Sequence, residues 1–312
     1  MSQETSGATA WPTVTGIIPT KDRPELLKRA VRSLFDQDYE GHLEVIVVFD
    51  GTDPVDIGVD VPENRSLRTM RNSRTPGLAG NRNTGYLAAT GTYVGGCDDD
   101  DEWLPAKVRR QVELLQSRPD AILAATGMYV HYRGEDIRRD SPAHDLHLQD
   151  FLRHRYPEVN ASAFLIERER LLTEIGLVDE ELPGGYGEDY EFLMRASRLG
   201  PVVCIPDPLT RIHFHDQSFY VSRWQTIDKA LKYILDRVPE FHDEPAGLAR
   251  IEGQLAFANA AMGQRSEAVG YASRSLRRAP TTKHSYAALL VASGLVSADK
   301  VAAMARQRGR GI

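Results

Sequence analysis

The sequence contains very little cysteine. Only Cys97 and Cys204 occur among the 312 residues, and each lies in an apolar run that predicts a β-strand. Two cysteines in separate strands exclude the disulfide framework of small secreted domains. We therefore predict buried free thiols and a reducing, cytoplasmic location.

Long hydrophobic runs are absent as well. No apolar stretch approaches the roughly 18 residues that span a bilayer. The N-terminal sequence "MSQETSGATAWP" lacks the basic start and apolar core of a secretory leader. We expect residues 1–12 to be a flexible N-terminus and the chain to have no transmembrane segment. This absence argues against a polymerase that extrudes its product through a membrane.

The chain also lacks an excess of positive charge. It has 38 Lys and Arg against 44 Asp and Glu, a formal net charge of −6. General nucleic-acid binding is therefore excluded on electrostatic grounds. The basic end "RQRGRGI" is the local exception, and we interpret it as a frayed terminus.

What the sequence does contain is an alternation of strand and helix patterns. Thr13–Ile18 and Leu43–Phe49 are continuous β-branched runs, typical of strands buried on both faces. Between them, Pro24 fits a first helical turn with Asp22 as its candidate cap. Further strands are expected at Arg65–Met70 and Thr92–Cys97, and further helices from Pro105 to Ser117 and from Glu188 to Leu199. Residues 13–218 are thus predicted to form an α/β domain with a mostly parallel sheet.

The strand signals stop near residue 219. Residues 219–312 are predicted to be a helical C-terminal region packed on the α/β domain. Within it, one imperfect tetratricopeptide-like helix pair is indicated by the spacing of Leu255, Gly263, Ala268, Leu276 and Pro280. The pattern leaves open whether these helices shape an acceptor site or an interface between subunits.

Acidic residues gather where the predicted strands end. The first strand leads into "PTKDRP", the second into "DGTD" and the fourth into "CDDDDEW". The carboxyl ends of parallel strands meet at one edge, where ligands bind in open α/β sheets. In an extended segment Asp98 and Asp100 point to one side, which favours Mg²⁺ or Mn²⁺ held together with diphosphate oxygens. The alternative from charge alone is an acidic turn on the surface.

Taken with its neighbours, the acidic run resembles a known family. It is preceded by "GLAGNRNTGY" and followed by "WLPAKV"; "IIPTKDRPELLKRAVRSL" and "EVIVVFDGT" come earlier, and "GGYGEDYEFLMRASRLG" and "RIHFHDQS" later. In this order the strings resemble the family 2 glycosyltransferases over residues 13–218. The resemblance implies a GT-A fold and an inverting, metal-dependent transfer of a sugar from a nucleotide diphosphate sugar to an acceptor hydroxyl.

The resemblance also implies a role for individual residues. Pro19, Thr20, Asp22, Arg23 and Asp50 match the surroundings of the nucleotide base, and Arg82 matches a basic residue that faces the nucleotide. Asp98 matches the first acid of the Asp-x-Asp motif, near the ribose, Asp99 its middle residue at the nucleotide, Asp100 its metal ligand and Asp101 its trailing acid. Asp189 matches the general base, with Glu188 before it, and His213 a further metal ligand. The implied cofactor is Mn²⁺ or Mg²⁺, and the implied donor is a UDP-sugar foremost, with dTDP- or GDP-sugars as alternatives.

Several of these residues also have structural interpretations. Glu188 and Asp189 suit a first helical turn, Arg82 could pair with an aspartate, and Asp50 suits a turn. His213 and His215 alternate on a strand, so only one faces the site, and we expect Trp103 to pack beneath the acidic run. Two departures from the family pattern are Phe49, where an acid usually stands, and Gly80, where alanine is usual. Asp99 is a third, and its charge either strengthens metal binding or points to solvent.

Two other functions compete with this reading. A sugar-nucleotide pyrophosphorylase would need a glycine-rich loop after the first strand, which "PTKDRP" is not. A non-catalytic nucleotide-sugar-binding module would not need to keep Asp98, Asp100 and Asp189. The acceptor, a small molecule or a glycan, would be bound by the region between Tyr129 and Asn160 and by the C-terminal helices, where no motif is readable. The oligomeric state is likewise open.

Overall fold

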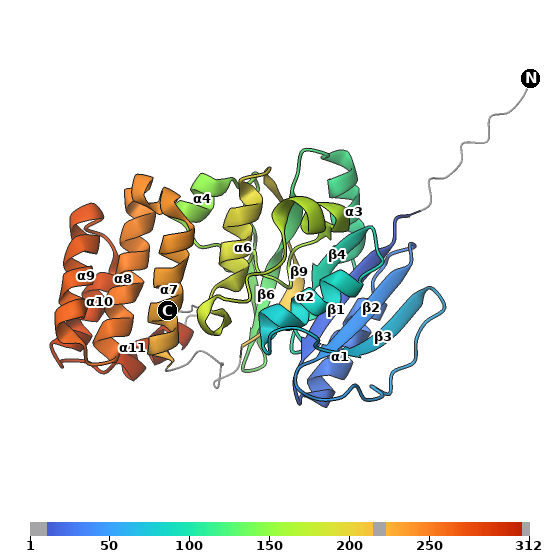
Figure 1. The fold of residues 1–312 in the computed structure, drawn as a ribbon, viewed down its shortest axis with the longest axis horizontal. Coiled ribbons are helices and arrows are strands. Elements are labelled where there is room, and N and C mark those ends of the chain that lie inside the picture. Colours follow the sequence, from blue (N-terminus) through green and yellow to red (C-terminus); the bar gives the residue numbers. More distant parts are fainter. Residues whose placement is uncertain (1–10, 215–222, 308–312) are drawn as a thin grey trace, which may run out of the picture.

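The computed structural model describes residues 11–214 and 223–307. The first strands of the chain lie at one end of the molecule, β6 and β9 lie near its middle, and the C-terminal helices form the other end (Figure 1). The strands are β1 Val14–Thr20, β2 Leu43–Phe49, β3 Arg65–Arg71, β4 Tyr93–Gly96, β5 Glu102–Trp103, β6 Leu123–Tyr132, β7 Glu135–Arg139, β8 Ile166–Glu167 and β9 Val202–His213. The predicted α/β class is confirmed.

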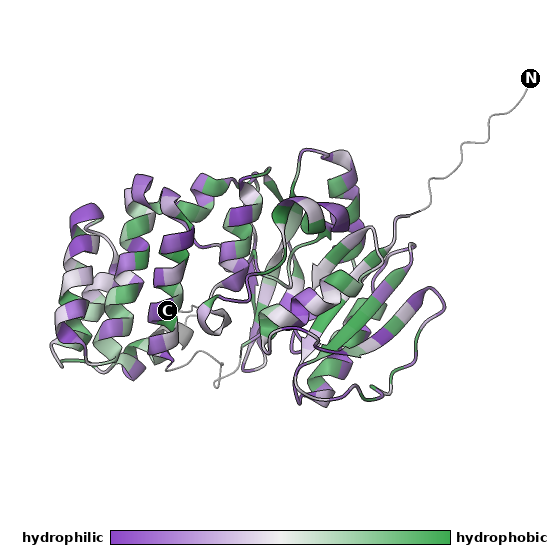
Figure 2. Ribbon diagram, viewed as in Figure 1, coloured by the Kyte–Doolittle hydropathy of each residue, from purple (hydrophilic) through white to green (hydrophobic). Residues whose placement is uncertain are grey.

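The first sheet has the strand order β3-β2-β1-β4-β8. Its first four strands are parallel, and β8 joins β4 in the antiparallel direction. Every residue of β1 and β2 is buried, which explains why both read as continuous apolar runs rather than alternating ones. Figure 2 shows this hydrophobic centre next to helices that alternate apolar and polar stripes.

The second sheet has the order β5-β9-β6-β7. Here β6 and β9 run parallel, whereas the outer strands β5 and β7 are antiparallel to their neighbours. Cys204 lies half-buried in β9, and Cys97 is buried just after β4. Both cysteines are free, as predicted.

Helices cover these sheets. Those of the α/β part are α1 Pro24–Phe35, α2 Leu78–Ala88, α3 Lys107–Ser117, α4 Leu148–Arg153, α5 Arg168–Arg170 and α6 Glu188–Ser197, with short turns η1 Leu171–Ile175 and η2 Pro183–Gly185. The predicted start of α6 is confirmed. The predicted start of α3 at Pro105 is wrong by two residues, because the amide of Lys107 closes a turn onto the carbonyl of Leu104 at 3.0 Å.

The predicted cap of α1 is also wrong. The N-cap residue is Arg23, and it makes no side-chain capping hydrogen bond. Asp22 instead adopts a left-handed backbone conformation with a φ of 55°, which few residues other than glycine, asparagine and aspartate tolerate. The turn at Asp22 directs Arg23 over the aspartate run rather than away from it.

The C-terminal helices follow as α7 Trp224–Arg237, η3 Pro239–Asp243, α8 Pro245–Ala261, α9 Arg265–Arg278, α10 Lys283–Ala292 and α11 Ala298–Gln307. α8 and α9 are joined by a turn at Gly263, whose φ is +77°, and the tetratricopeptide-like character of this pair stays a prediction. Leu231, Ile234 and Leu248 belong to the same hydrophobic core as Tyr190 and Phe192 of α6. The C-terminal helices therefore pack directly onto the α/β part. Among the described residues, no helix is both long and apolar enough to cross a membrane.

Candidate active site

Three strand ends meet at one edge of the first sheet. The register pairs Thr20 at the end of β1 with Phe49 at the end of β2, and the amide of Asp50 donates to the carbonyl of Thr20 at 3.0 Å. From β4, the amide of Cys97 donates to the carbonyl of Ile17 at 2.9 Å. The aspartate run therefore emerges beside the loop that follows β1.

The two inner aspartates of the run are tied to that loop. The Thr20 hydroxyl donates to Oδ2 of Asp99 at 2.7 Å, and the Arg23 guanidinium pairs with both Asp99 and Asp100, the latter at 2.7 Å. Asp99 is completely buried, and burial raises its pKa to about 6. Asp99 therefore does not point to solvent, as one of our two interpretations had it. Asp100 keeps about a fifth of its side chain exposed.

The outer two aspartates are joined by Ser162. The amide of Asp98 donates to Oγ of Ser162 at 3.1 Å, and that hydroxyl donates to Oδ2 of Asp101 at 2.7 Å. Asp101 is buried and also accepts the amide of His213 at 3.3 Å. Burial, followed by the charges of Asp98 and Asp100, raises the pKa of Asp101 well above its ordinary value. The run is an ordered, largely desolvated loop, so a solvated acidic turn does not describe it.

Trp103 packs beneath this loop, as expected. It is buried, and its indole N–H lies 3.2 Å from the carbonyl of Gly96 and 3.0 Å from that of Ser162. Sequence reasoning missed the residue beneath it, Lys107, whose ammonium group lies 3.9 Å from the centre of the indole ring. Lys107 is fully buried and donates to Gln111 at 2.8 Å. Burial lowers its pKa to about 7.

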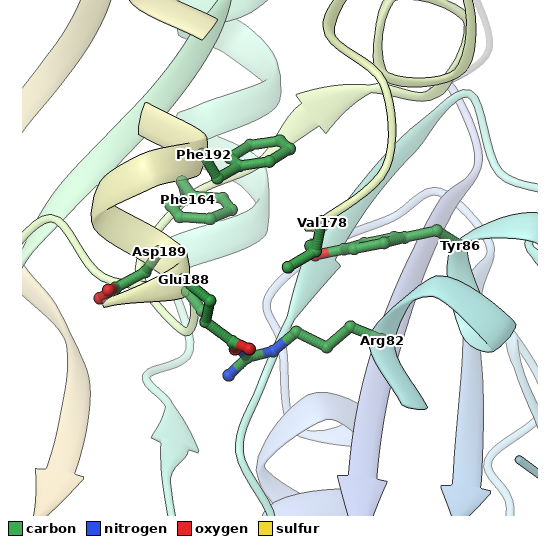
Figure 3. A pocket seen from close by; sticks show the side chains of 8 residues that line it. Arg82, Tyr86, Phe164, Val178, Glu188, Asp189 and Phe192 are labelled. Atoms are coloured by element: carbon green, nitrogen blue, oxygen red, sulfur yellow. The ribbon is translucent and has the colours of Figure 1, made fainter. Parts of the chain in front are cut away.

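Arg82 connects the aspartate run to α6. Its guanidinium is buried and pairs with Asp98 at 2.5 Å and with the buried carboxylate of Glu188. Glu188 and Asp189 share a small pocket with Arg82, lined further by Tyr86, Ala161, Phe164, Val178 and Phe192. Figure 3 shows Glu188 reaching to Arg82, while the carboxylate of Asp189 points elsewhere. The structural interpretation of Arg82 as an ion-pair partner of an aspartate is thus confirmed.

Asp189 lies at the start of α6, with a quarter of its side chain exposed. Its Oδ1 accepts the backbone N–H of Tyr190 at 2.8 Å and lies 3.6 Å from Nη2 of Arg155. The Arg155 guanidinium is 5.7 Å from the ring centres of both Tyr186 and Tyr190. Arg155 was not predicted, because it belongs to the loop after α4, where no motif is readable.

The remaining predicted residues lie around the end of β2. Oδ1 of Asp50 accepts Nδ2 of Asn72 at 3.1 Å and the amide of Gly77 at 3.2 Å, and Lys21 lies 3.6 Å from Oδ2. Asp50 therefore organises the loop before α2. Phe49 is buried, Pro19 lies within buried β1, and Asp22 is exposed in its left-handed turn.

His213 is the last residue of β9. Its Nε2 lies 2.7 Å from Oε1 of Glu102, and its ring centre is 4.8 Å from that of His131. Burial lowers the pKa of His213. Within the described ranges, no group of three or more His, Cys, Asp or Glu side chains is arranged to hold a metal ion. His215 lies outside the described residues, so the choice between the two histidines stays open.

Known proteins resemble this chain in sequence and in fold. Residues 15–170, half of the chain, match the family model described as Glycosyl transferase family 2. The amylovoran biosynthesis glycosyltransferase AmsE of Erwinia amylovora is 25% identical over 199 residues, covering 62% of this chain and 72% of the relative. For seven further curated relatives, the matched region spans 33% to 66% of the relative's own length.

Two solved structures have a similar fold. The crystal structure of S. aureus TarS 1-349 in complex with UDP-GlcNAc has a TM-score of 0.60 at 15% identity, covering 91% of both chains. The mannosyltransferase PcManGT of Pyrobaculum calidifontis, in complex with GDP-Man and Mn²⁺, has a TM-score of 0.56 at 18% identity, covering 94% of this chain and 87% of the other. At these identities the likeness concerns the fold, and it extends beyond the matched family region to α6 and the C-terminal helices.

Proposed function

The chain belongs to glycosyl transferase family 2, and on that premise we propose that it transfers a sugar from a nucleoside diphosphate sugar to an acceptor hydroxyl by a single, inverting displacement. The observation that carries the proposal is the link from Asp98 through the buried Arg82 to the buried Glu188. This link joins the acidic loop after β4 to the residue next to Asp189. The carboxylates that could hold a metal ion on the donor diphosphate and the carboxylate that could act as the general base thus belong to one site.

The donor is proposed to bind along the ends of β1, β2 and β4. Thr20, Arg23 and Asp50 would surround the base, and Asp98 would face the ribose. The two solved structures of similar fold are complexes with UDP-GlcNAc and with GDP-Man. This supports a nucleotide sugar as the donor, but it does not select the base. We place a UDP-sugar first. Because Phe49 is buried where an acid is usual, dTDP- and GDP-sugars stay as alternatives.

The donor set of the aspartate run suits a divalent ion held partly by the substrate. Asp98 and Asp100 are the partly exposed members, with a third and a fifth of their side chains accessible, and hard carboxylate oxygens suit Mg²⁺ or Mn²⁺. Two carboxylates leave further coordination positions for phosphate oxygens. A bound ion would offset the negative charge that develops on the departing nucleoside diphosphate.

Asp189 is proposed to take the proton of the acceptor hydroxyl. Its Oδ1 is held by the amide of Tyr190 at the start of α6, and general-base catalysis requires a carboxylate that is positioned in this way. Arg155, at 3.6 Å, adds a positive charge on the same side. An inverting displacement needs no enzyme nucleophile, so one positioned carboxylate suffices.

Thermal unfolding with nucleotide sugars tests the donor site. UDP-, dTDP-, GDP- and CDP-sugars are each added with and without Mn²⁺; a ligand at a hundred times its Kd adds about 2.7 kcal/mol to the free energy of unfolding. We expect one base class to raise the melting temperature in an Mn²⁺-dependent way. Asp100→Asn should remove the Mn²⁺-dependent part, while Asp120→Asn, at an exposed carboxylate paired with Arg118, should keep it.

The competing functions give different results in the same experiment. A non-catalytic binding module would show the shift but no sugar transfer or donor hydrolysis. A pyrophosphorylase would release a nucleoside triphosphate when pyrophosphate is added. A panel without any shift would contradict donor binding at this site.

A further inference from the structure

Arg250 of α8 reaches the beginning of α6 from the C-terminal helices. Its Nη2 donates to the hydroxyl of Tyr190 and to the carbonyl of Leu152, the latter at 3.3 Å. The guanidinium carbon also lies 5.4 Å from the centre of the Tyr190 ring, within the range of a cation–π contact. One arginine of the C-terminal region thus fixes both the hydroxyl and the ring of Tyr190.

Tyr190 is well placed to pass this constraint to Asp189. Its side chain is buried, and its hydroxyl donates to the carbonyl of Phe151 at 2.6 Å while accepting from Arg250. Its backbone N–H donates to Oδ1 of Asp189 at 2.8 Å. The anchored ring and the amide that holds the Asp189 carboxylate thus belong to the same residue, in the first turn of α6.

The helix that carries Arg250 cannot shift easily. A Cβ atom at Gly247, in the first turn of α8, would collide with the carbonyl oxygen of Leu152, so α8 touches the end of α4 backbone to backbone. Ile234 of α7 would lie only 3.4 Å from a Cβ at Gly187, the N-cap residue of α6. Close packing of this kind resists displacement.

We infer that Arg250 is a positioning residue for the transfer reaction, holding Asp189 in its working position through Tyr190. The inference rests on the proposed function, because it takes Asp189 as the general base. It gives the C-terminal helices a defined part in the reaction, although Arg250 itself touches neither donor nor reacting atoms. A displacement of about 1 Å at a reacting group can reduce a rate by about a hundredfold.

The test compares the steady-state kinetics of variants at Arg250 and Tyr190, including the double variant Arg250→Ala/Tyr190→Phe, with those of the wild type. Arg250→Ala should lower kcat by about tenfold or more and leave the KM and the melting-temperature shift for the donor unchanged. Arg250→Lys should restore part of kcat, because an ammonium group still donates to the Tyr190 hydroxyl. Tyr190→Phe should lower kcat similarly. The double variant should lose no more kcat than the worse single variant, since both changes break the hydrogen bond between Arg250 and the Tyr190 hydroxyl.

Arg109→Ala is the matched control. Arg109 belongs to α3, outside the C-terminal helices, and makes a surface ion pair with Asp38 at 3.0 Å, so its loss should leave kcat unaltered. If Arg250→Ala fails to fold, Tyr190→Phe and Arg250→Lys still decide the question. Wild-type kcat in Arg250→Ala, additive losses in the double variant, or an equal loss of donor binding would each overturn the inference.

Asp189→Asn separates the positioning role of Arg250 from the proposed role of Asp189 as the base. If Asp189→Asn keeps the wild-type kcat, the proposed base is wrong whatever Arg250 does. If Asp189→Asn abolishes transfer while Arg250→Ala and Tyr190→Phe are fully active, only the positioning role is wrong.

Discussion

The aspartate loop after β4 presents the partly exposed carboxylates of Asp98 and Asp100, and the start of α6 presents that of Asp189. The two regions are held in place by different interactions. In the loop, Asp98, Asp99 and Asp101 are fixed by hydrogen bonds and ion pairs with Arg82, Arg23 and Ser162. At the start of α6, the neighbour of Asp189 is fixed by the packing of distant helices and by Arg250.

This difference has energetic consequences. A buried ion pair that loses one partner leaves an uncompensated charge, which is strongly destabilising. A helix that loses one packing contact can instead shift its position while the protein stays folded. We therefore expect changes in the loop to affect folding and changes behind α6 to affect the reaction. Substitutions in each region test that contrast, and the change in the free energy of unfolding should be greatest for Arg82.

Arg82→Ala should destabilise the protein most, because both contrasted regions depend on this side chain. Its loss leaves the buried Glu188 without its partner and Asp98 without its 2.5 Å contact, at a cost of about 3–5 kcal/mol. Urea unfolding measures the change. Arg118→Ala breaks pairs with Asp120 and Asp145 in which every side chain stays at least a third accessible, and it should destabilise the protein far less. Equal effects of the two would show that burial of the Arg82 pair does not matter.

Gly247→Ala should test the packing behind α6. The added methyl group collides with the backbone of Leu152, so α8 must move, which we expect to cost about 1–3 kcal/mol and to lower kcat. Gly270 of α9 is the matched control, since a Cβ there meets nothing nearer than 3.7 Å. Gly270→Ala should be neutral or stabilise by up to about 1 kcal/mol. A stable, fully active Gly247→Ala variant would refute the tight contact between α8 and α4.

Lys107→Met should change how the stability of the protein depends on pH. Burial lowers the pKa of Lys107 to about 7 in the folded protein, whereas an unfolded lysine titrates near 10.4. Between these values the unfolded chain binds more protons, so this group makes the wild type more stable as pH rises from about 7, by at most about 1.4 kcal/mol per pH unit. Unfolding measured from pH 7 to 9 should show a slope that Lys107→Met lacks. Equal slopes would mean that Lys107 stays charged in the folded state.

The same contrast explains how far the sequence could be interpreted. The buried strands and the aspartate run were predictable because β-branched runs and clustered charges are local patterns, and parallel register then brings Thr20 beside Asp99 although 79 positions separate them. The cap at Asp22 and the helix start at Pro105 were wrong, since the backbone turns differently at both places.

The surroundings of Asp189 could not be predicted in the same way. Arg155 approaches Asp189 from a loop without a readable motif. Arg250 reaches the neighbouring Tyr190 from α8, 60 positions later in the chain, and the helical pattern of α8 does not show which of its residues faces α6. Such contacts follow from how helices pack against each other. Only the spatial arrangement shows them, whereas the carboxylate that they hold is visible in "GEDYEF".

The most direct test of the central claim is kcat of Asp189→Asn with the donor that the thermal panel selects. We expect a loss of about 10²–10⁴-fold, with the donor-induced melting-temperature shift retained and with Asp120→Asn, at an exposed surface carboxylate, fully active. Transfer at the wild-type rate by Asp189→Asn would contradict the account, because the carboxylate at the start of α6 would then not be the base.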